Sequence, residues 1–257
     1  MAYENILYEK KDGVATITLN RPEHLNAFSP GMGNDLANAF DEMERDEEVR
    51  VGIITGTGRG FSSGAYISGS NTHQLNTPTE EIMRPRSRPT FPWDYPKPLV
   101  AAVNGAAYGA GFNLALSCDI IIASTEARFC FPMSRLGVFP PWPGTVALAL
   151  YVGKARATEA TLMASPISGE EAYSWGLANR VVPPEELMEE ANTWARKLAA
   201  LAPVSLRLIK EELRESWDHH FDRTGNRLRF MATRLTSDRE EGHLAWKEKR
   251  APKFTGR

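Results

Sequence analysis

Several features common in other classes of protein are scarce or absent in this 257-residue sequence. Only two cysteines occur, Cys118 and Cys130, and no Cys/His spacing typical of metal ligands is present, so we expect two buried, reduced thiols and no metal site. No stretch of about 18 apolar residues occurs, and the N-terminus lacks the basic and apolar regions of a signal peptide. These absences predict no membrane span and a cytoplasmic location.

The charge balance excludes further classes of partner. The formal net charge is -2, with 30 basic and 32 acidic residues well mixed along the chain, so no surface for nucleic acid is expected. With 42% apolar and 24% charged residues, the composition is typical of a globular protein with a substantial core. An enzyme acting on a small molecule is therefore the default class.

Hydrophobic periodicity predicts an α/β fold. Short apolar segments alternate with amphipathic ones, and a hairpin turn is expected at Lys11-Asp12-Gly13, where glycine adopts positive φ at little cost. This alternation favours a largely parallel sheet whose loops carry the site at one edge. The expected strands cover residues 5–9, 14–20, 51–55, 98–103 and 119–124, and the expected helices cover residues 31–44 and 110–118.

Two regions depart from this alternation. Between Gly69 and Pro98 the sequence is rich in proline and lacks periodicity, which predicts a long loop or flap. From Pro184 onward we expect only helices, the first with an apolar face formed by Leu187, Ala191, Trp194 and Leu198. A later apolar stripe within residues 228–235 needs a partner surface, such as another subunit.

Two glycine turns follow predicted strands, Gly64-Ala65-Tyr66 and Gly109-Ala110-Gly111. The first ends the segment IITGTGRGFSSGAYI, whose glycine spacing and lack of lysine exclude a dinucleotide fingerprint or a P-loop. One interpretation is that the glycines serve backbone conformation alone. The other is that each turn points a free backbone N–H outward, because two such donors stabilise a thioester oxyanion by roughly 3 to 4 kcal/mol each.

Five ordered segments make the chain resemble the crotonase (enoyl-CoA hydratase/isomerase) superfamily over nearly its full length. They are LNRPEHLNAF, GRGFSSGAYI, VAAVNGAAYGAGFNLALSCDIIIAS, ARFCFPMSRLGVFP and TSDREEGHLAWKEKRAPKF. The resemblance implies a crotonase-like spiral of ββα units with an acyl-CoA site in residues 1–195, and a C-terminal helical trimerisation region in residues 196–257. It also implies a homotrimer or dimer of trimers, with CoA as part of the substrate and no covalently bound cofactor.

The resemblance also implies the site residues. The thioester oxygen would bind between the backbone N–H groups of Ala65 and Ala110. Lys247, Lys249 or Arg250 could reach the nucleotide phosphates, although a solvated charged helix is the alternative. The implied contacts to CoA are His24, Leu25, Ala27, Ala65, Tyr66, Ile67 and Ser68.

Two residues depart from the family pattern. Family members that hydrate enoyl-CoA carry glutamates at the positions of Asn113 and Met133. Neither an amide nor a thioether exchanges protons near neutral pH, so two groups that each contribute about 10²- to 10⁴-fold to rate are absent. Phe139 and Trp142 would join Met133 in an apolar pocket that suits an acyl chain or a ring.

Few side chains are candidates to replace these glutamates. The predicted flap could deliver His73, Glu80, Glu81 or Asp94 over the thioester. His73 has the most suitable intrinsic pKa and is a speculative acid/base, with a solvated loop histidine as the alternative. Tyr66 and Tyr108 adjoin the two turns, but a phenol is a poor base near pH 7. If the site strand continues past Met133, Arg135 shares its face and could bind a substrate carboxylate. Asp119 is expected to be structural.

Two functions therefore stay open. The first is a crotonase-type enzyme that stabilises a thioester oxyanion and performs hydration, isomerisation, hydrolysis or C–C cleavage. The second is a non-catalytic protein that binds acyl-CoA on the same scaffold. Efficient hydration of a simple enoyl-CoA is not expected in either case.

Overall fold

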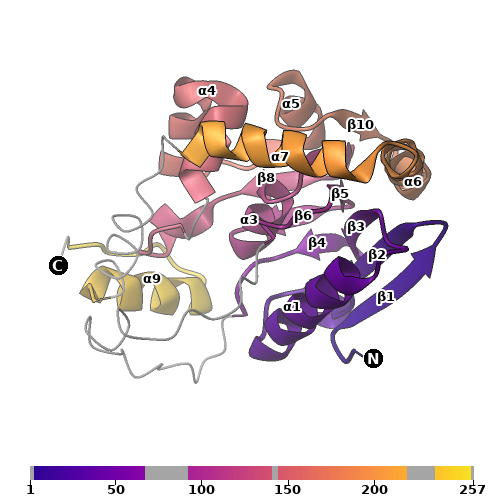
Figure 1. Cartoon of the computed structure of the whole chain (residues 1–257). Helices are drawn as coiled ribbons and strands as arrows, with labels where there is room; N and C mark the ends of the chain where they lie inside the picture. Colours follow the sequence, from indigo (N-terminus) through magenta and orange to yellow (C-terminus); the bar gives the residue numbers. More distant parts are fainter. Residues whose placement is uncertain (1–2, 67–91, 141–143, 219–234, 256–257) are drawn as a thin grey trace.

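The computed structural model of the protein describes residues 3–66, 92–140, 144–218 and 235–255, the last four residues of the third range in backbone only. Its larger sheet has six strands in the order β1-β2-β3-β5-β7-β10, all parallel except β1, which pairs antiparallel with β2 (Figure 1). The strands are β1 (Ile6–Lys11), β2 (Val14–Leu19), β3 (Val51–Gly56), β5 (Leu99–Val103), β7 (Ile120–Ser124) and β10 (Arg180–Val182).

The N-terminal elements confirm the sequence prediction closely. Asp12 and Gly13 both have positive φ in the turn between β1 and β2, as expected for a tight hairpin. Helix α1 (Pro30–Arg45) is capped by Ser29, whose hydroxyl accepts a hydrogen bond from the Met32 backbone N–H at 3.2 Å. Its buried residues are Met32, Leu36, Ala39, Phe40 and Met43.

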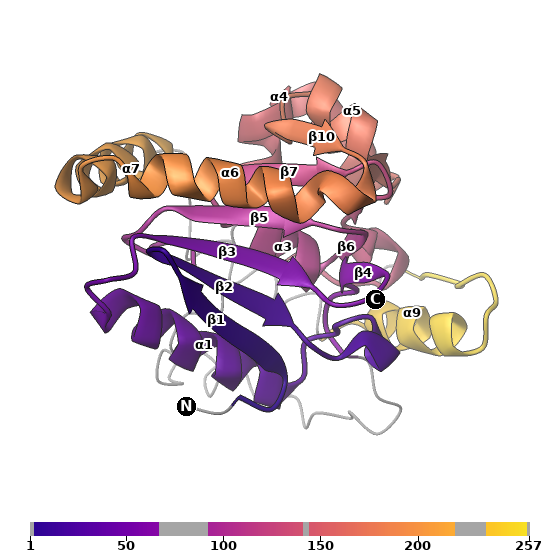
Figure 2. The ribbon, with the colours of Figure 1, turned by 90° about the vertical axis from the view of Figure 1, so that its right-hand side faces the viewer.

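The two faces of the larger sheet bury different helices. In β5, Leu99, Ala101 and Val103 belong to the core that includes α1, whereas Val100 and Ala102 pack with α6 (Leu187–Ala199). Figure 2 shows α1 along one side of the sheet and α6 along the other. The near-continuous apolar sequence of β5 follows from this burial on both faces.

A smaller sheet and further helices follow the carboxyl ends of the main strands. The sheet has the order β4-β6-β8-β9, with β9 antiparallel to β8. Its strands are β4 (Gly60–Ser62), β6 (Ala106–Tyr108), β8 (Arg128–Cys130) and β9 (Ile167–Ser168). The helices are α3 (Ala110–Leu116), α4 (Gly144–Leu162) and α5 (Gly169–Ser174), and the 3-10 turns are η1 (Pro22–His24), η2 (Pro132–Arg135) and η3 (Pro184–Glu186).

The C-terminal third is helical only in part. Helices α6, α7 (Pro203–Asp218) and α9 (Ser237–Lys247) confirm the expectation, but the tail from residue 248 to residue 255 is not helical, which corrects it. The predicted stripe at 228–235 lies almost wholly outside the described residues. The boundary predicted after residue 195 falls within α6, and the division into two regions remains a prediction. Within the described ranges, every helix is too short or too polar to cross a membrane.

The two glycine turns meet through backbone contact. Gly64 has φ of +95°, and a Cβ placed there would lie 2.6 Å from the carbonyl oxygen of Tyr108. A Cβ at Gly111 would clash with the backbone oxygen of Ser62 in the same way. Only glycine permits this approach, so these two residues set the distance between β4 and the start of α3.

We predict that Gly64→Ala destabilises the fold more than Gly176→Ala. Gly176 also has positive φ, at +81°, but the nearest atom to its Cβ position is 3.8 Å away. Alanine at positive φ costs roughly 1–2 kcal/mol, and forced overpacking adds about 1–3 kcal/mol at Gly64 only. Chemical denaturation followed by circular dichroism measures both variants. Equal losses in the two would show that the backbone contact does not matter.

Candidate active site

The first glycine turn directs the backbone N–H of Ala65 away from the segment around Phe28. Ala65 pairs with Phe28 as an isolated parallel bridge. Phe28 donates to the Gly64 carbonyl at 2.7 Å and accepts from the Tyr66 N–H at 3.0 Å, so these bonds flank Ala65. The N–H of Ala65 therefore points to the opposite side of the segment, where no backbone carbonyl of the described residues accepts it.

The second turn supplies a similar donor. Ala110 is the first residue of α3, and the first turn of a helix leaves its N–H groups without intrahelical acceptors. Gly109 is fixed by donation to the Cys130 carbonyl at 2.9 Å and has φ of +53°. A Cβ on Gly64 would lie 3.3 Å from the nitrogen of Ala110, so the two turns adjoin. Ala65 and Ala110 therefore lie on neighbouring turns, and their joint contact with one oxygen atom remains a prediction.

Asn26 holds the loop that contains the predicted CoA contacts. Its wholly buried side chain donates to the carbonyls of Thr57 and Gly60 at 2.9 and 2.8 Å and accepts from the Arg21 N–H at 2.8 Å. Asn26 and Leu25 both have positive φ. The sequence analysis did not single out Asn26, although asparagine is among the residues that best tolerate this conformation.

His24, Leu25 and Ala27 lie together beside the first turn. The Ala27 N–H donates to the His24 carbonyl, and the Ser63 N–H donates to the Leu25 carbonyl. The His24 ring meets the Tyr66 ring edge-on at 5.2 Å between centroids. The guanidinium of Arg21 lies 5.5 Å from the centre of the same ring. These two contacts hold the Tyr66 side chain beside the first turn, with 38% of its surface exposed.

Asn113 makes a hydrogen bond with a residue that is distant in the sequence. Its side chain is wholly buried, and its Oδ1 accepts a hydrogen bond from the Gly144 N–H at 2.8 Å. Gly144 is the first residue of α4, so Asn113 satisfies one of the donors at that helix N-terminus. Asn113 follows Ala110 by one helical turn and therefore joins α4 to the second glycine turn.

Met133 lies on η2, not on a strand, which corrects the expectation of a site strand running to Arg135. Strand β8 ends at Cys130, and Pro132 has no N–H with which to continue the ladder. Arg135 is exposed and donates to the Met163 carbonyl at 3.4 Å, so the predicted shared face with Met133 is wrong. Met133 itself is 8% exposed, and its Cε lies 3.3 Å from the Cβ position of Gly109.

Several predicted residues lie outside the described part of the chain. They are Ile67, Ser68, His73 and Trp142. Their roles remain predictions, and so does the pocket wall formed by Trp142 with Met133 and Phe139.

The other polar groups near the turns are poor proton carriers. Burial raises the pKa of the Tyr108 phenol above its ordinary value. Both cysteines are buried and free, Cys130 beside Gly109 and Cys118 at the far end of α3. Burial raises the pKa of the Cys130 thiol to about 11 and that of the Cys118 thiol further. These groups are therefore protonated and uncharged at neutral pH.

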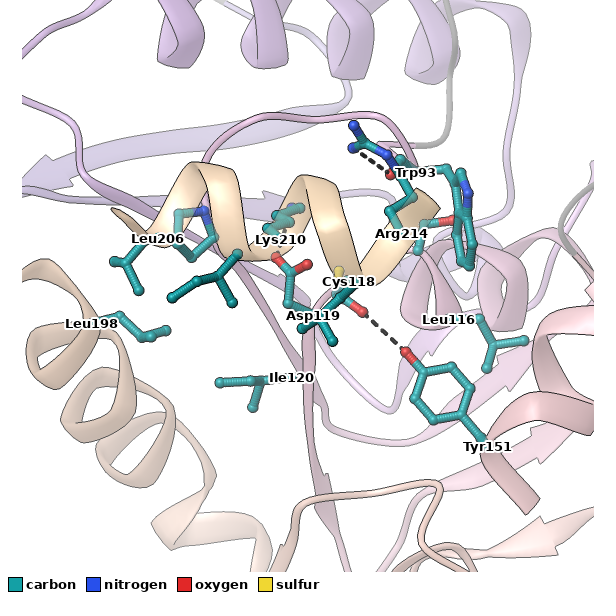
Figure 3. A pocket seen from close by; sticks show the side chains of 14 residues that line it. Trp93, Leu116, Cys118, Asp119, Ile120, Tyr151, Leu198, Leu206, Lys210 and Arg214 are labelled. Atoms are coloured by element: carbon teal, nitrogen blue, oxygen red, sulfur yellow. Dashed lines mark hydrogen bonds and ion pairs between the residues drawn. The ribbon is translucent and has the colours of Figure 1, made fainter. Parts of the chain in front are cut away.

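A separate cavity of about 260 Å³ lies beneath α7, at the amino ends of β5 and β7 (Figure 3). Asp119 lines it and accepts hydrogen bonds from the Leu99 N–H and from Lys210 Nζ, each at 2.7 Å, which confirms its structural role. Arg214 donates to the Trp93 carbonyl at 3.4 Å and pairs with Asp94 at 3.6 Å. The cavity is at the opposite end of α3 from Ala110, so it is distinct from the two turns.

Arg250 pairs with two glutamates, one of them on α9. Its guanidinium donates to Glu241 at 2.6 and 2.9 Å and to Glu248 at 2.6 Å. This pairing opposes the predicted phosphate contact by Arg250. Lys247 and Lys249 are exposed, and their contact with phosphate remains a prediction.

The described site can polarise a carbonyl oxygen but contains no carboxylate at its two turns. The enoyl-CoA hydratase/isomerase family profile matches residues 9–257. The chain is similar to 1,2-epoxyphenylacetyl-CoA isomerase of Escherichia coli, with 38% identity over 99% of both chains, and to 2,3-dehydroadipyl-CoA hydratase of the same species, with 34% identity over 98% of this chain and 99% of that one.

The solved structures agree with these relatives. Methylmalonyl-CoA decarboxylase in complex with 2-nitronate-propionyl-CoA matches with a TM-score of 0.86 and 29% identity, covering 100% of both chains. The sheet order, the paired turns and the full-length matches lead to one assignment. The chain belongs to the enoyl-CoA hydratase/isomerase family of the crotonase superfamily and has the crotonase fold.

Proposed function

We propose that this protein is an enzyme that binds an acyl-CoA thioester with its carbonyl oxygen between the N–H groups of Ala65 and Ala110. The observation that carries the proposal is the contact between the two turns, with the Ala110 nitrogen 3.3 Å from the Cβ position of Gly64. Two fixed donors stabilise the negative charge that an enolate or tetrahedral intermediate places on this oxygen. CoA would run along His24, Leu25, Ala27 and Tyr66 toward Ile67 and Ser68.

The reaction is proposed to pass through an enolate intermediate, as in isomerisation or C–C cleavage, and not to be rapid hydration. Hydration needs a group that activates water, whereas Asn113 is committed to the N-terminus of α4 and Met133 has no proton to exchange. Relatives named as an isomerase, a hydratase and a decarboxylase support a shared oxyanion site that serves several reactions. The apolar surface of Met133 favours an acyl chain or a ring.

The second candidate function is acyl-CoA binding without turnover. The specific observation in its favour is that Asn113, one helical turn after Ala110, is wholly buried and serves as a helix cap. Mass spectrometry of products from straight-chain, aromatic and cyclic acyl-CoA thioesters separates the two functions. Tight binding with no product from any thioester would favour the binding protein.

We also propose a homotrimer or dimer of trimers, assembled through the C-terminal helices. Several apolar side chains of α7 are exposed, among them Val204 at 68% and Leu208 at 58%. Contact with another copy of the chain would remove this surface from water.

We predict that Ala110→Pro lowers kcat/KM for the thioester that the panel identifies by about 10²- to 10³-fold, because it removes one oxyanion donor. Proline is well tolerated at the first residue of a helix, so the fold of α3 is expected to survive. Ala110→Gly keeps the N–H and serves as the matched control. Similar rates for both variants would rule out a role for this donor.

We predict that crotonyl-CoA is hydrated slowly or not at all, because both acid/base positions lack a carboxylate. The loss of enoyl absorbance measures the rate. A rate constant on the order of hundreds per second, within the ordinary range for enzymes, would contradict the proposed loss of acid/base groups.

We predict that Leu208→Arg dissociates the oligomer, because a charge in an apolar interface is costly to desolvate. Light scattering after size-exclusion chromatography measures the mass of both proteins. A monomeric wild-type protein would contradict the proposed assembly, and an unchanged mass in the variant would exclude this face of α7 from it.

A further inference from the structure

Two ion pairs hold α7 at a distance from the strands beneath it. Lys210 Nζ donates to Asp119 Oδ2 at 2.7 Å and to the Lys97 carbonyl at 2.9 Å. One helical turn later, the Arg214 guanidinium lies 3.6 Å from the carboxylate of Asp94. The Lys210 and Arg214 side chains are only 11% and 19% exposed, and a closer approach of α7 would remove these charges further from water at a cost. The cavity beneath α7 is therefore kept open by the fold.

This cavity has the size and the lining of a site for a small ring. Its volume of about 260 Å³ lies between the roughly 150 Å³ that suffice for benzene and the about 300 Å³ at which ordinary ligand pockets begin. Apolar side chains from α3, β7, α4, α6 and α7 surround it. They are Leu116, Ile120, Tyr151, Leu198, Leu206 and Leu213. A single aromatic ring with a short chain therefore fits these walls.

The cavity opens beside two exposed apolar residues of α7. Ile209 and Leu213 line it and are nevertheless 54% and 58% exposed. At 3.6 residues per turn, Leu206 and Leu213 lie about half a turn from Val204 and Leu208, the residues proposed above to contact another copy of the chain. The mouth is thus on the opposite side of α7 from the proposed contact between subunits, and a ligand that enters there buries apolar surface.

Asp119 supplies the polar group that a ligand would meet. Its Oδ2 accepts both hydrogen bonds of this carboxylate, from the Leu99 N–H and from Lys210. Within the described ranges Oδ1 accepts none, and the side chain is 32% exposed. The hydroxyls of Ser117 and Tyr151 already donate to backbone carbonyls, at 2.8 and 3.5 Å. The cavity therefore offers an acceptor, Oδ1, to a ligand that carries an O–H donor.

The charges around the cavity are balanced. Lys210 is paired with Asp119, and Arg214 with Asp94. A charged ligand would leave water for apolar walls without an opposite charge of its own, which is costly. A ligand with no net charge avoids this penalty.

We propose that the cavity beneath α7 is a second binding site, and that it takes a small, uncharged aromatic alcohol. The ring lies among the apolar side chains, and the hydroxyl donates to Asp119 Oδ1, which Figure 3 shows among them. The site is at the opposite end of α3 from Ala110, so this ligand and an acyl-CoA thioester bind at the same time. The inference does not depend on the function proposed above.

The test is a fluorine NMR titration of para-fluorobenzyl alcohol with the full chain. We expect saturable binding with a Kd on the order of 1 mM, as is usual for so small a ligand. The matched probe is para-fluorobenzyl methyl ether, which keeps the ring and the oxygen but lacks the O–H. It is expected to bind about 10-fold more weakly, because a hydrogen bond to a charged acceptor is lost. The anion para-fluorobenzoate is expected to bind more weakly than the alcohol.

Two substitutions locate the bound probe. Leu206→Trp fills the cavity from α7, and Ile209→Trp fills its mouth from an exposed residue, so the second variant remains informative if the first fails to fold. Both are expected to abolish saturable binding. Leu162→Trp makes the same change at a residue that is 69% exposed and outside the cavity, and it is expected to keep the wild-type Kd. Circular dichroism checks the fold of each variant.

Five results would overturn the inference. They are absence of saturable binding, equal Kd values for the alcohol and the ether, wild-type binding in both cavity variants, equal loss in Leu162→Trp, and displacement of the probe by butyryl-CoA. The last would place the probe in the acyl-CoA site. A protein that binds the alcohol but no acyl-CoA thioester would remove the proposed function and leave this second site intact.

Discussion

The backbone contact between Gly64 and Tyr108 is the constraint on which the site depends. Two loops that follow different strands approach so closely that a single methyl group on Gly64 would strike a carbonyl oxygen. The contact places the nitrogens of Ala65 and Ala110 on neighbouring turns, and it is made to backbone atoms of Tyr108. The proposed oxyanion site is therefore a property of the fold, whereas the reaction depends on the side chains added around it.

The elements surrounding this contact are joined by single polar side chains. Asn26 connects the loop after β2 with the loop between β3 and β4, and Asn113 connects α3 with α4. Both amides are wholly buried, where an unsatisfied polar group is costly, so their hydrogen bonds specify one arrangement of the loops. The turns are thus held by backbone contact and oriented by buried amides.

Local sequence patterns were sufficient for much of the fold. The hairpin at Asp12 and Gly13, the apolar face of α1 and the two glycine turns follow from periodicity and turn chemistry. The patterns failed where the outcome depends on distant residues. Gly144, the partner of Asn113, is 31 residues away. The contact between Gly242 and Leu136 also joins residues from distant parts of the chain, so the packing of α9 on residues 136 and 137 could not be predicted from local patterns.

The hydrogen bond between Asn113 and Gly144 also limits which substitutions at residue 113 could be accepted during evolution. A glutamate at residue 113 would add a methylene and a charge to a wholly buried position, and it would disturb the cap of α4 at the same time. A substitution that supplied this carboxylate would therefore first lower the stability of the fold. Compensating changes near the start of α4 would have to come first, so the gain of a glutamate here by a single substitution is hindered.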